Sequence, residues 1–177
     1  KTWAFVGPLL GALVRPLGGW LSDRIGGAKV TFWNFAVMLI AAIAILVLLP
    51  SAPGSATATG FFAAFVILFV TTGIGNGSVF HVVPKVFMTL HLRAAGSDKA
   101  AQARAVSEGE IESSVALGFT AAIAALGLFF IPAVIGVSIN ATGTPSTALA
   151  VFVVFYVTCL LATWWWYWRR GAEVQCN

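Results

Sequence analysis

One arginine lies deep inside an apolar stretch near the start of the chain. Arg15 is the only formal charge well within residues 2–21. A charge at the centre of a membrane span costs about 2.5–3.5 kcal/mol, so its presence needs a physical reason. A planar guanidinium has five N–H donors and suits the bidentate binding of a small oxyanion. Arg15 is therefore the first candidate ligand-binding residue.

The neighbours of Arg15 are spaced so that they share its side of a helix. Gly7, Gly11 and Gly18 recur at helical intervals with it, and glycines mark faces on which neighbouring helices pack closely. We therefore expect Arg15 to face the protein interior; the alternative is a side chain that snorkels to the membrane surface, roughly 10 Å away. Because no expected span clearly contains a carboxylate, either the ligand or a carboxylate elsewhere in the protein supplies the opposite charge.

A second group of polar residues occurs in the run TTGIGNGS at 71–78. Its glycines alternate at i, i+2 and i+4, which allows a backbone or a ligand to approach closely. Asn76 adds hydrogen-bonding groups at membrane depth. Gly75, Asn76 and Gly77 are therefore candidate residues of a polar cavity, although the same glycines also fit ordinary helix packing.

The sequence gives no support to enzyme or metal chemistry. It has no P-loop, no Ser/His/Asp pattern, no paired carboxylates within a span and no metal-ligand spacing. Its two cysteines, Cys159 and Cys176, are too few for a disulfide framework. His81 is expected to be a hydrogen-bonded packing residue rather than a proton carrier. We therefore expect no catalytic activity, no metal and no cofactor.

The elements that position these residues are expected to be membrane-spanning helices. Of the 177 residues, 59% are hydrophobic and only 9% are charged, which excludes a soluble globular domain. A helix needs about 20 apolar residues to cross the ~30 Å hydrocarbon core. Stretches of that length occur at 2–21, 30–49, 60–83, 111–137 and 147–168. The sequence thus predicts an all-α membrane protein with five transmembrane helices.

Basic residues are distributed unequally between the connections. One side carries only Lys1, whereas the other carries eight, namely Arg24, Lys29, Lys85, Arg93, Lys99, Arg104, Arg169 and Arg170. The positive-inside rule then places the N-terminus outside, the C-terminus in the cytoplasm and 84–110 in a cytoplasmic loop. The net charge of +4 is explained by basic residues at the cytoplasmic ends of the expected spans, so no nucleic-acid partner is expected. Within the loop we expect a short surface helix at 97–108, and Ser107 with Glu110 as the capping box of the next span.

The connection after the first span contains a recognisable motif. The run GWLSDRIGGAK at 19–29 resembles the G-x-x-x-D-R-x-G-x-x-[KR] loop of the major facilitator superfamily. The resemblance assigns Gly19, Asp23, Arg24 and Gly26 to a gating motif at the cytoplasmic face. Its physical basis is twofold. Glycine allows the chain to reverse tightly, and the Asp23 carboxylate can interact favourably with the positive, N-terminal end of a neighbouring helix.

Further motifs narrow the resemblance to the nitrate/nitrite porter family. They are GALVRPLGG at 11–19, GIGNGSVF at 73–80, ALGFTAAIAALGLFFIP at 116–132 and NATGTP at 140–145, in that order. The chain then corresponds to the eighth to twelfth helices, most of the C-terminal half of a twelve-helix bundle. The resemblance makes Arg15 one of two arginines that clasp the anion and adds Gly118 to the substrate site.

The resemblance implies a secondary transporter that moves nitrate and nitrite across a bacterial cytoplasmic membrane by alternating access. Nitrate/nitrite exchange is expected, because no clear titratable carboxylate lies within the spans. The alternatives are proton-coupled nitrate symport, transport of another small anion, and a structural membrane subunit without transport. The expected partners are the two anions, the lipid bilayer and the N-terminal half of the same protein. That half is expected upstream, because the chain begins at Lys1 without an initiator Met or a signal peptide.

Overall fold

The computed structural model describes residues 5–49 and 57–168, and every regular element in these ranges is helical. The helices are α1 (Val6–Ile25), α2 (Gly27–Val47), α3 (Thr57–Ala95), α4 (Lys99–Thr142) and α5 (Ser146–Thr163), followed by a π-helical turn, η1 (Trp164–Trp168). The expectation of an all-α protein is confirmed. The sequence predictions that concern Lys1, Arg169, Arg170 and Cys176 lie outside the described residues.

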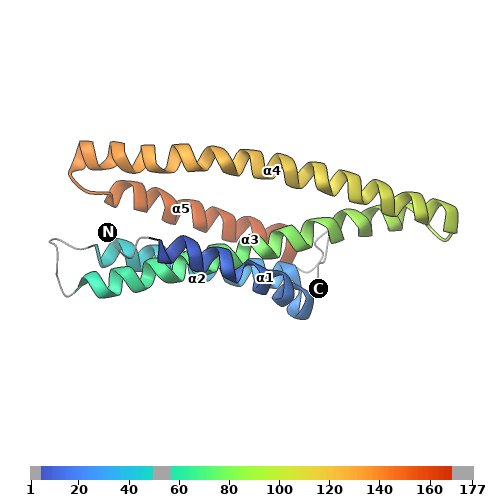
Figure 1. Ribbon diagram of the computed structural model, residues 1–177, viewed down its shortest axis with the longest axis horizontal. Coiled ribbons are helices and arrows are strands. Elements are labelled where there is room, and N and C mark those ends of the chain that lie inside the picture. Colours follow the sequence, from blue (N-terminus) through green and yellow to red (C-terminus); the bar gives the residue numbers. More distant parts are fainter. Residues whose placement is uncertain (1–4, 50–56, 169–177) are drawn as a thin grey trace.

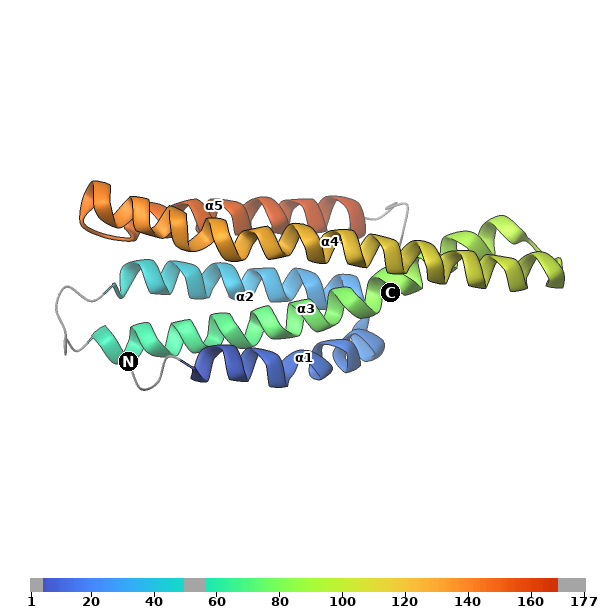
Figure 2. The ribbon, with the colours of Figure 1, turned by 45° about the horizontal axis from the view of Figure 1, so that its top comes forward.

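The five helices run roughly side by side in an elongated bundle, with α3 at its centre (Figures 1 and 2). α3 contacts α1, α2 and α4, while α2 also contacts α5. α4 pairs with α3 along the part that extends beyond the other helices, and it contacts α5 elsewhere. In the part of the chain that the structure describes, α1 and α4 do not touch.

Four helical stretches are long and apolar enough to cross a membrane: Gly27–Val47, Ala58–Ala95, Lys99–Thr142 and Ser146–Trp166. They overlap with four of the five expected spans, namely 30–49, 60–83, 111–137 and 147–168. α1, which contains most of the span expected at 2–21, is not among the four. Its length of 20 residues is sufficient, but Arg15, Asp23 and several glycines lower its mean hydropathy. Such a helix is better suited to protein neighbours than to lipid.

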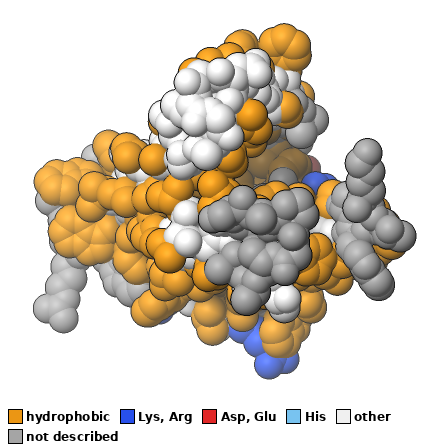
Figure 3. All heavy atoms as spheres, turned by 90° about the vertical axis from the view of Figure 1, so that its left-hand side faces the viewer, with side chains coloured by type: hydrophobic (Ala, Val, Ile, Leu, Met, Phe, Trp, Pro, Cys, Tyr) orange, Lys and Arg blue, Asp and Glu red, His pale blue; other side chains and the backbone are white. Residues whose placement is uncertain are grey.

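Large apolar side chains cover much of the surface. Figure 3 shows them around the end of the bundle at which α3 begins and α4 ends. The exposure is greatest along α4, where Phe119 and Phe129 are 69% and 72% exposed. An apolar surface of this extent needs lipid or further protein around it. The protein is a multi-pass membrane protein.

Glycines bring α1 and α3 into unusually close contact. Gly7, Gly11 and Gly18 are buried on the face of α1 that packs against α3, as expected for the glycines of this stripe. Arg15, which was expected to face the interior with them, is exposed in the described part of the chain. A Cβ atom added to Gly18 would lie 2.0 Å from the carbonyl oxygen of Ile74, and one added to Gly73 would lie 2.2 Å from that of Gly11. No side chain fits in these places, so the two backbones are in direct contact.

The segment 84–110 differs from the expected loop. α3 continues through Pro84 to Ala95, and α4 already begins at Lys99. Only a short turn joins them, in which Gly96 has a φ of +62°. The residues on both sides of this turn are rich in alanine and other good helix formers, so they extend the two helices.

The N-cap of α4 is Asp98, whose carboxylate accepts a hydrogen bond of 3.1 Å from the backbone N–H of Ala100. The expected capping box of Ser107 and Glu110 is therefore wrong, because both residues lie inside a continuous helix. The expected surface helix at 97–108 is the first part of α4 rather than a separate element.

The contact between α1 and α3 predicts opposite effects for two adjacent glycines. In Gly18→Ala the added methyl group overlaps the α3 backbone, so we expect the protein to lose about 1–3 kcal/mol of stability. Gly19→Ala is the matched control, because its Cβ would lie 3.8 Å from the His81 ring, which is ordinary contact. The thermal midpoint of the purified protein in detergent should fall in the first variant and stay level or rise in the second. Equal midpoints would contradict the close contact.

Candidate functional site

Arg15 is held at the point where α1 and α3 are closest. A Cβ atom added to Gly77 would lie 1.9 Å from the carbonyl oxygen of Arg15. The backbone of Arg15 is therefore fixed against α3. Its side chain is exposed and makes neither a hydrogen bond nor an ion pair with any described residue. A closely packed backbone thus carries a guanidinium that has no partner among the described residues.

Asn76 lies beside this contact, one position before Gly77 on α3. Its side chain is exposed, like that of Arg15. Both residues are therefore exposed on the two helices that pack most closely, Arg15 on α1 and Asn76 on α3.

The glycines on either side of Asn76 serve packing. The space next to Gly77 is filled by the backbone of Arg15. The space next to Gly75 is filled by Asn34, whose Nδ2 would lie 2.4 Å from an added Cβ. Both glycines shape the site indirectly, because they allow α1 and α2 to approach α3.

Asn34 is a buried polar residue that the sequence analysis did not single out. It lies on α2, is 8% exposed, and donates a hydrogen bond of 3.3 Å from Nδ2 to the sulfur of Met38. An asparagine within the apolar run 30–49 is the sequence signal for such a residue. Its position opposite Gly75 was not visible in the sequence, because it depends on the register of α2 against α3.

Two serines form a buried polar link between α1 and α3. Ser22 donates a hydrogen bond of 2.9 Å to the carbonyl oxygen of Gly18, and its hydroxyl lies 2.6 Å from that of Ser78. Ser78 is completely buried. The hydroxyl of Ser78 is therefore used within the protein and does not face an open cavity.

Gly118 is not brought to Arg15 by the described part of the chain. It lies on α4, where an added Cβ would have no atom within 4 Å. α4 contacts α3 and α5 but not α1. The open space around Gly118 leaves room for a further helix or a ligand, neither of which the described residues provide.

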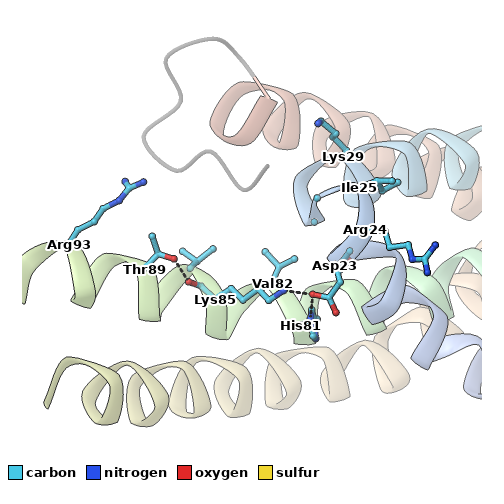
Figure 4. Close-up of a pocket in the computed structure, with 13 residues that line it drawn as sticks. Asp23, Arg24, Ile25, Lys29, His81, Val82, Lys85, Thr89 and Arg93 are labelled. Atoms are coloured by element: carbon cyan, nitrogen blue, oxygen red, sulfur yellow. Dashed lines mark hydrogen bonds and ion pairs between the residues drawn. The ribbon is translucent and has the colours of Figure 1, made fainter. Parts of the chain in front are cut away.

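The gating motif forms a charged cluster at the turn between α1 and α2 (Figure 4). Gly26 makes this turn with a φ of +90°, a conformation that glycine adopts readily. Asp23 forms an ion pair with Lys85, and its Oδ1 lies 2.8 Å from Nε2 of His81. The guanidinium carbon of Arg24 lies 4.4 Å from the centre of the Trp20 ring. Gly19 lies near His81 in this cluster.

These contacts correct the role expected for Asp23. Asp23 was expected to interact with the positive, N-terminal end of a neighbouring helix. Instead its carboxylate pairs with two side chains of α3, and it does not cap the N-terminus of α2, which has no side-chain cap. The hydrogen bonds from Lys85 and His81 lower the pKa of Asp23, so the carboxylate stays ionised at neutral and mildly acidic pH. Because an ionised carboxylate only accepts, the Nε2–H of His81 is the donor. This is the hydrogen-bonded state that the sequence favoured for His81.

No family model matches the chain, but several curated proteins do. It is 42% identical over 171 residues to the nitrate/nitrite transporter NarU of Escherichia coli, and 40% identical over 176 residues to NarU of Salmonella typhimurium. It is also 33% identical over 175 residues to the probable nitrate/nitrite antiporter NarK2 of Thermus thermophilus. The chain is homologous to the nitrate/nitrite porters.

These matches cover nearly all of this chain but only part of each porter. They include 94%, 97% and 98% of the chain, and 36%, 37% and 34% of the respective relatives. The chain therefore spans about a third of the length of the porters that it matches.

The ion pair between Asp23 and Lys85 should hold the turn of this porter homologue against α3. In Lys85→Gln we expect faster hydrogen–deuterium exchange of the backbone amides at 22–29, because the main partner of Asp23 is lost. Lys99→Gln is the matched control, since Lys99 is an exposed lysine at the start of α4 outside this cluster. Exchange measured by mass spectrometry should be unchanged in the control. Equal exchange at 22–29 in both variants would show that the ion pair does not restrain the turn.

Proposed function

We propose that the protein containing this chain transports nitrate and nitrite across a bacterial cytoplasmic membrane by alternating access. The proposal is supported by the similarity of the chain to nitrate/nitrite transporters and by its helices that are long and apolar enough to span a membrane. The observation that carries it furthest is Arg15, a residue with a fixed backbone and an unpaired, exposed guanidinium within an expected span. A residue of that kind suits a planar oxyanion.

In this proposal Arg15 binds the anion through two parallel N–H donors, and Asn76 adds a further hydrogen bond. The contact between Gly77 and the Arg15 backbone fixes the point from which the side chain extends, and the exposed side chain itself becomes ordered when the anion binds. The exposed sides of Arg15 and Asn76 then face the second half of the site. We assign that half, with a second arginine, to the N-terminal six helices that the family resemblance implies.

The chain then supplies the eighth to twelfth helices of a twelve-helix bundle. α4 and its Gly118 have open space on the side away from α3 and α5, which suits packing against helices of the other half. The cluster of Asp23, His81 and Lys85 belongs to the cytoplasmic gate. The N-terminus of the chain is outside and its C-terminus is in the cytoplasm, as the distribution of basic residues predicts.

We further propose that the transport mode is exchange of nitrate for nitrite. Proton symport needs a group that titrates within the membrane and is coupled to the site. Glu173 lies outside the described residues, and the other five carboxylates are all exposed. His81 is hydrogen-bonded to the ionised Asp23. Arg15 stays positively charged at physiological pH. In exchange, nitrate or nitrite neutralises this charge each time the site reorients, so no proton carrier is needed.

The anion site is tested by Arg15→Lys in the full-length protein. Lysine keeps the positive charge but loses the planar pair of donors, so nitrate uptake should fall at least tenfold while membrane abundance stays normal. Arg104→Lys on the exposed part of α4 is the matched control and should keep wild-type uptake. Uptake of labelled nitrate into cells or vesicles provides the measurement. Wild-type uptake in Arg15→Lys would show that Arg15 is not the anion ligand.

The transport mode is tested in proteoliposomes that contain the full-length protein. We expect rapid nitrate uptake when nitrite is loaded inside, and little uptake into nitrite-free vesicles with or without a pH gradient. This follows because an empty, positively charged site reorients poorly across the membrane. Strong uptake that is driven by the gradient into nitrite-free vesicles, and abolished by His81→Ala, would establish proton symport instead.

A further inference from the structure

A basic hollow of about 750 Å³ lies at the turn between α1 and α2, where α3 leaves the bundle (Figure 4). Four basic residues line it, namely Arg24, Lys29, Lys85 and Arg93. Asp23 is the only carboxylate in its lining. The described lining therefore has a clear excess of positive charge.

Two of these basic residues are available to a ligand. Lys85 is paired with Asp23, and Arg24 is stacked over Trp20 and points away from Lys29 in Figure 4. Lys29 on α2 and Arg93 on α3 are exposed and make neither a hydrogen bond nor an ion pair with any described residue. They leave two unmatched cations in one hollow, which suits a phosphate group.

An apolar hollow of about 230 Å³ adjoins the basic one. The two hollows share Val82 and Val86 of α3 as lining residues. The rest of the apolar lining is Ala28, Thr31, Val79, Val83, Phe87 and Thr163. A polar compartment and an apolar compartment therefore meet along one turn of α3. A lipid has the same arrangement, with a polar headgroup joined to apolar acyl chains.

The residues around the two hollows are of the types that are typical of the membrane interface. Lys29 directly precedes the apolar run of α2, and the apolar helix α5 ends at Thr163, next to the exposed Trp164. Basic residues and tryptophans at the ends of spans mark the membrane interface. A phosphate at Lys29 would therefore stand at the interface, with the apolar hollow on its hydrocarbon side.

We propose that this paired hollow binds an anionic phospholipid. Its phosphate lies between Lys29 and Arg93, and part of an acyl chain lies against Val82 and Val86. Basic pockets between spanning helices on the cytoplasmic side are suited to such headgroups. The site is separate from the anion-binding role of Arg15 and does not depend on it.

The proposal is tested by native mass spectrometry of the full-length protein after removal of bound lipid. The protein is titrated with phosphatidylglycerol, with phosphatidylcholine and with inorganic phosphate alone. We expect preferential retention of phosphatidylglycerol, and a roughly thirtyfold loss of its affinity in Lys29→Gln/Arg93→Gln. Lys99→Gln/Arg104→Gln removes the same charge outside this hollow and should bind like the wild type.

Two outcomes overturn the proposal. One is wild-type affinity for phosphatidylglycerol in Lys29→Gln/Arg93→Gln. The other is binding of inorganic phosphate as tightly as the lipid, with displacement of the lipid, which would make the hollow a site for the free anion. If the double variant does not reach the thermal midpoint of its control, the single variant Lys29→Gln is used, with an expected loss of about fivefold.

Discussion

The direct contact of the α1 and α3 backbones is the constraint on which the other features depend. Side chains normally keep packed helix axes 8–10 Å apart. Here Gly11, Gly18, Gly73 and Gly77 remove the side chains from the interface. The contact fixes the backbone of Arg15, aligns Ser22 with Ser78 and brings Asp23 to the side chains of α3. The proposed anion site and the proposed gate lie on the same two helices and therefore share one closely packed support.

The second partner of α3 is α2, and the two contacts differ in kind. Against α1 the helix presents bare backbone, whereas against α2 it presents Gly75, whose missing side chain is replaced by that of Asn34. A polar side chain in an apolar span is costly unless it is hydrogen-bonded. Asn34 meets this requirement partly through Met38, within its own helix. The position of α2 against α3 is thereby defined by the fit of the Asn34 side chain into the space beside Gly75.

The sequence predicted those features that depend on local periodicity. The apolar runs and the glycine stripe follow from the period of a helix, and Arg15 is conspicuous because its cost in a membrane is high. The sequence did not predict contacts that depend on the register between helices. An example is the ion pair of Asp23 and Lys85, which lie 62 positions apart. The prediction also failed at Ser107, where a local capping pattern competed with an alanine-rich helix that simply continued through it. Asn34 was missed because its partner Gly75 becomes apparent only in three dimensions.

The length of α3 has a mechanical consequence. Its 39 residues correspond to about 58 Å at the rise of an α-helix, roughly twice the thickness of the hydrocarbon core. The backbone contact with Arg15 lies near the middle of this length, and the turn to α4 lies at one end. If α3 tilted about this contact, the turn to α4 would move further than the residues beside Arg15, because it lies about 27 Å along the helix from Gly77.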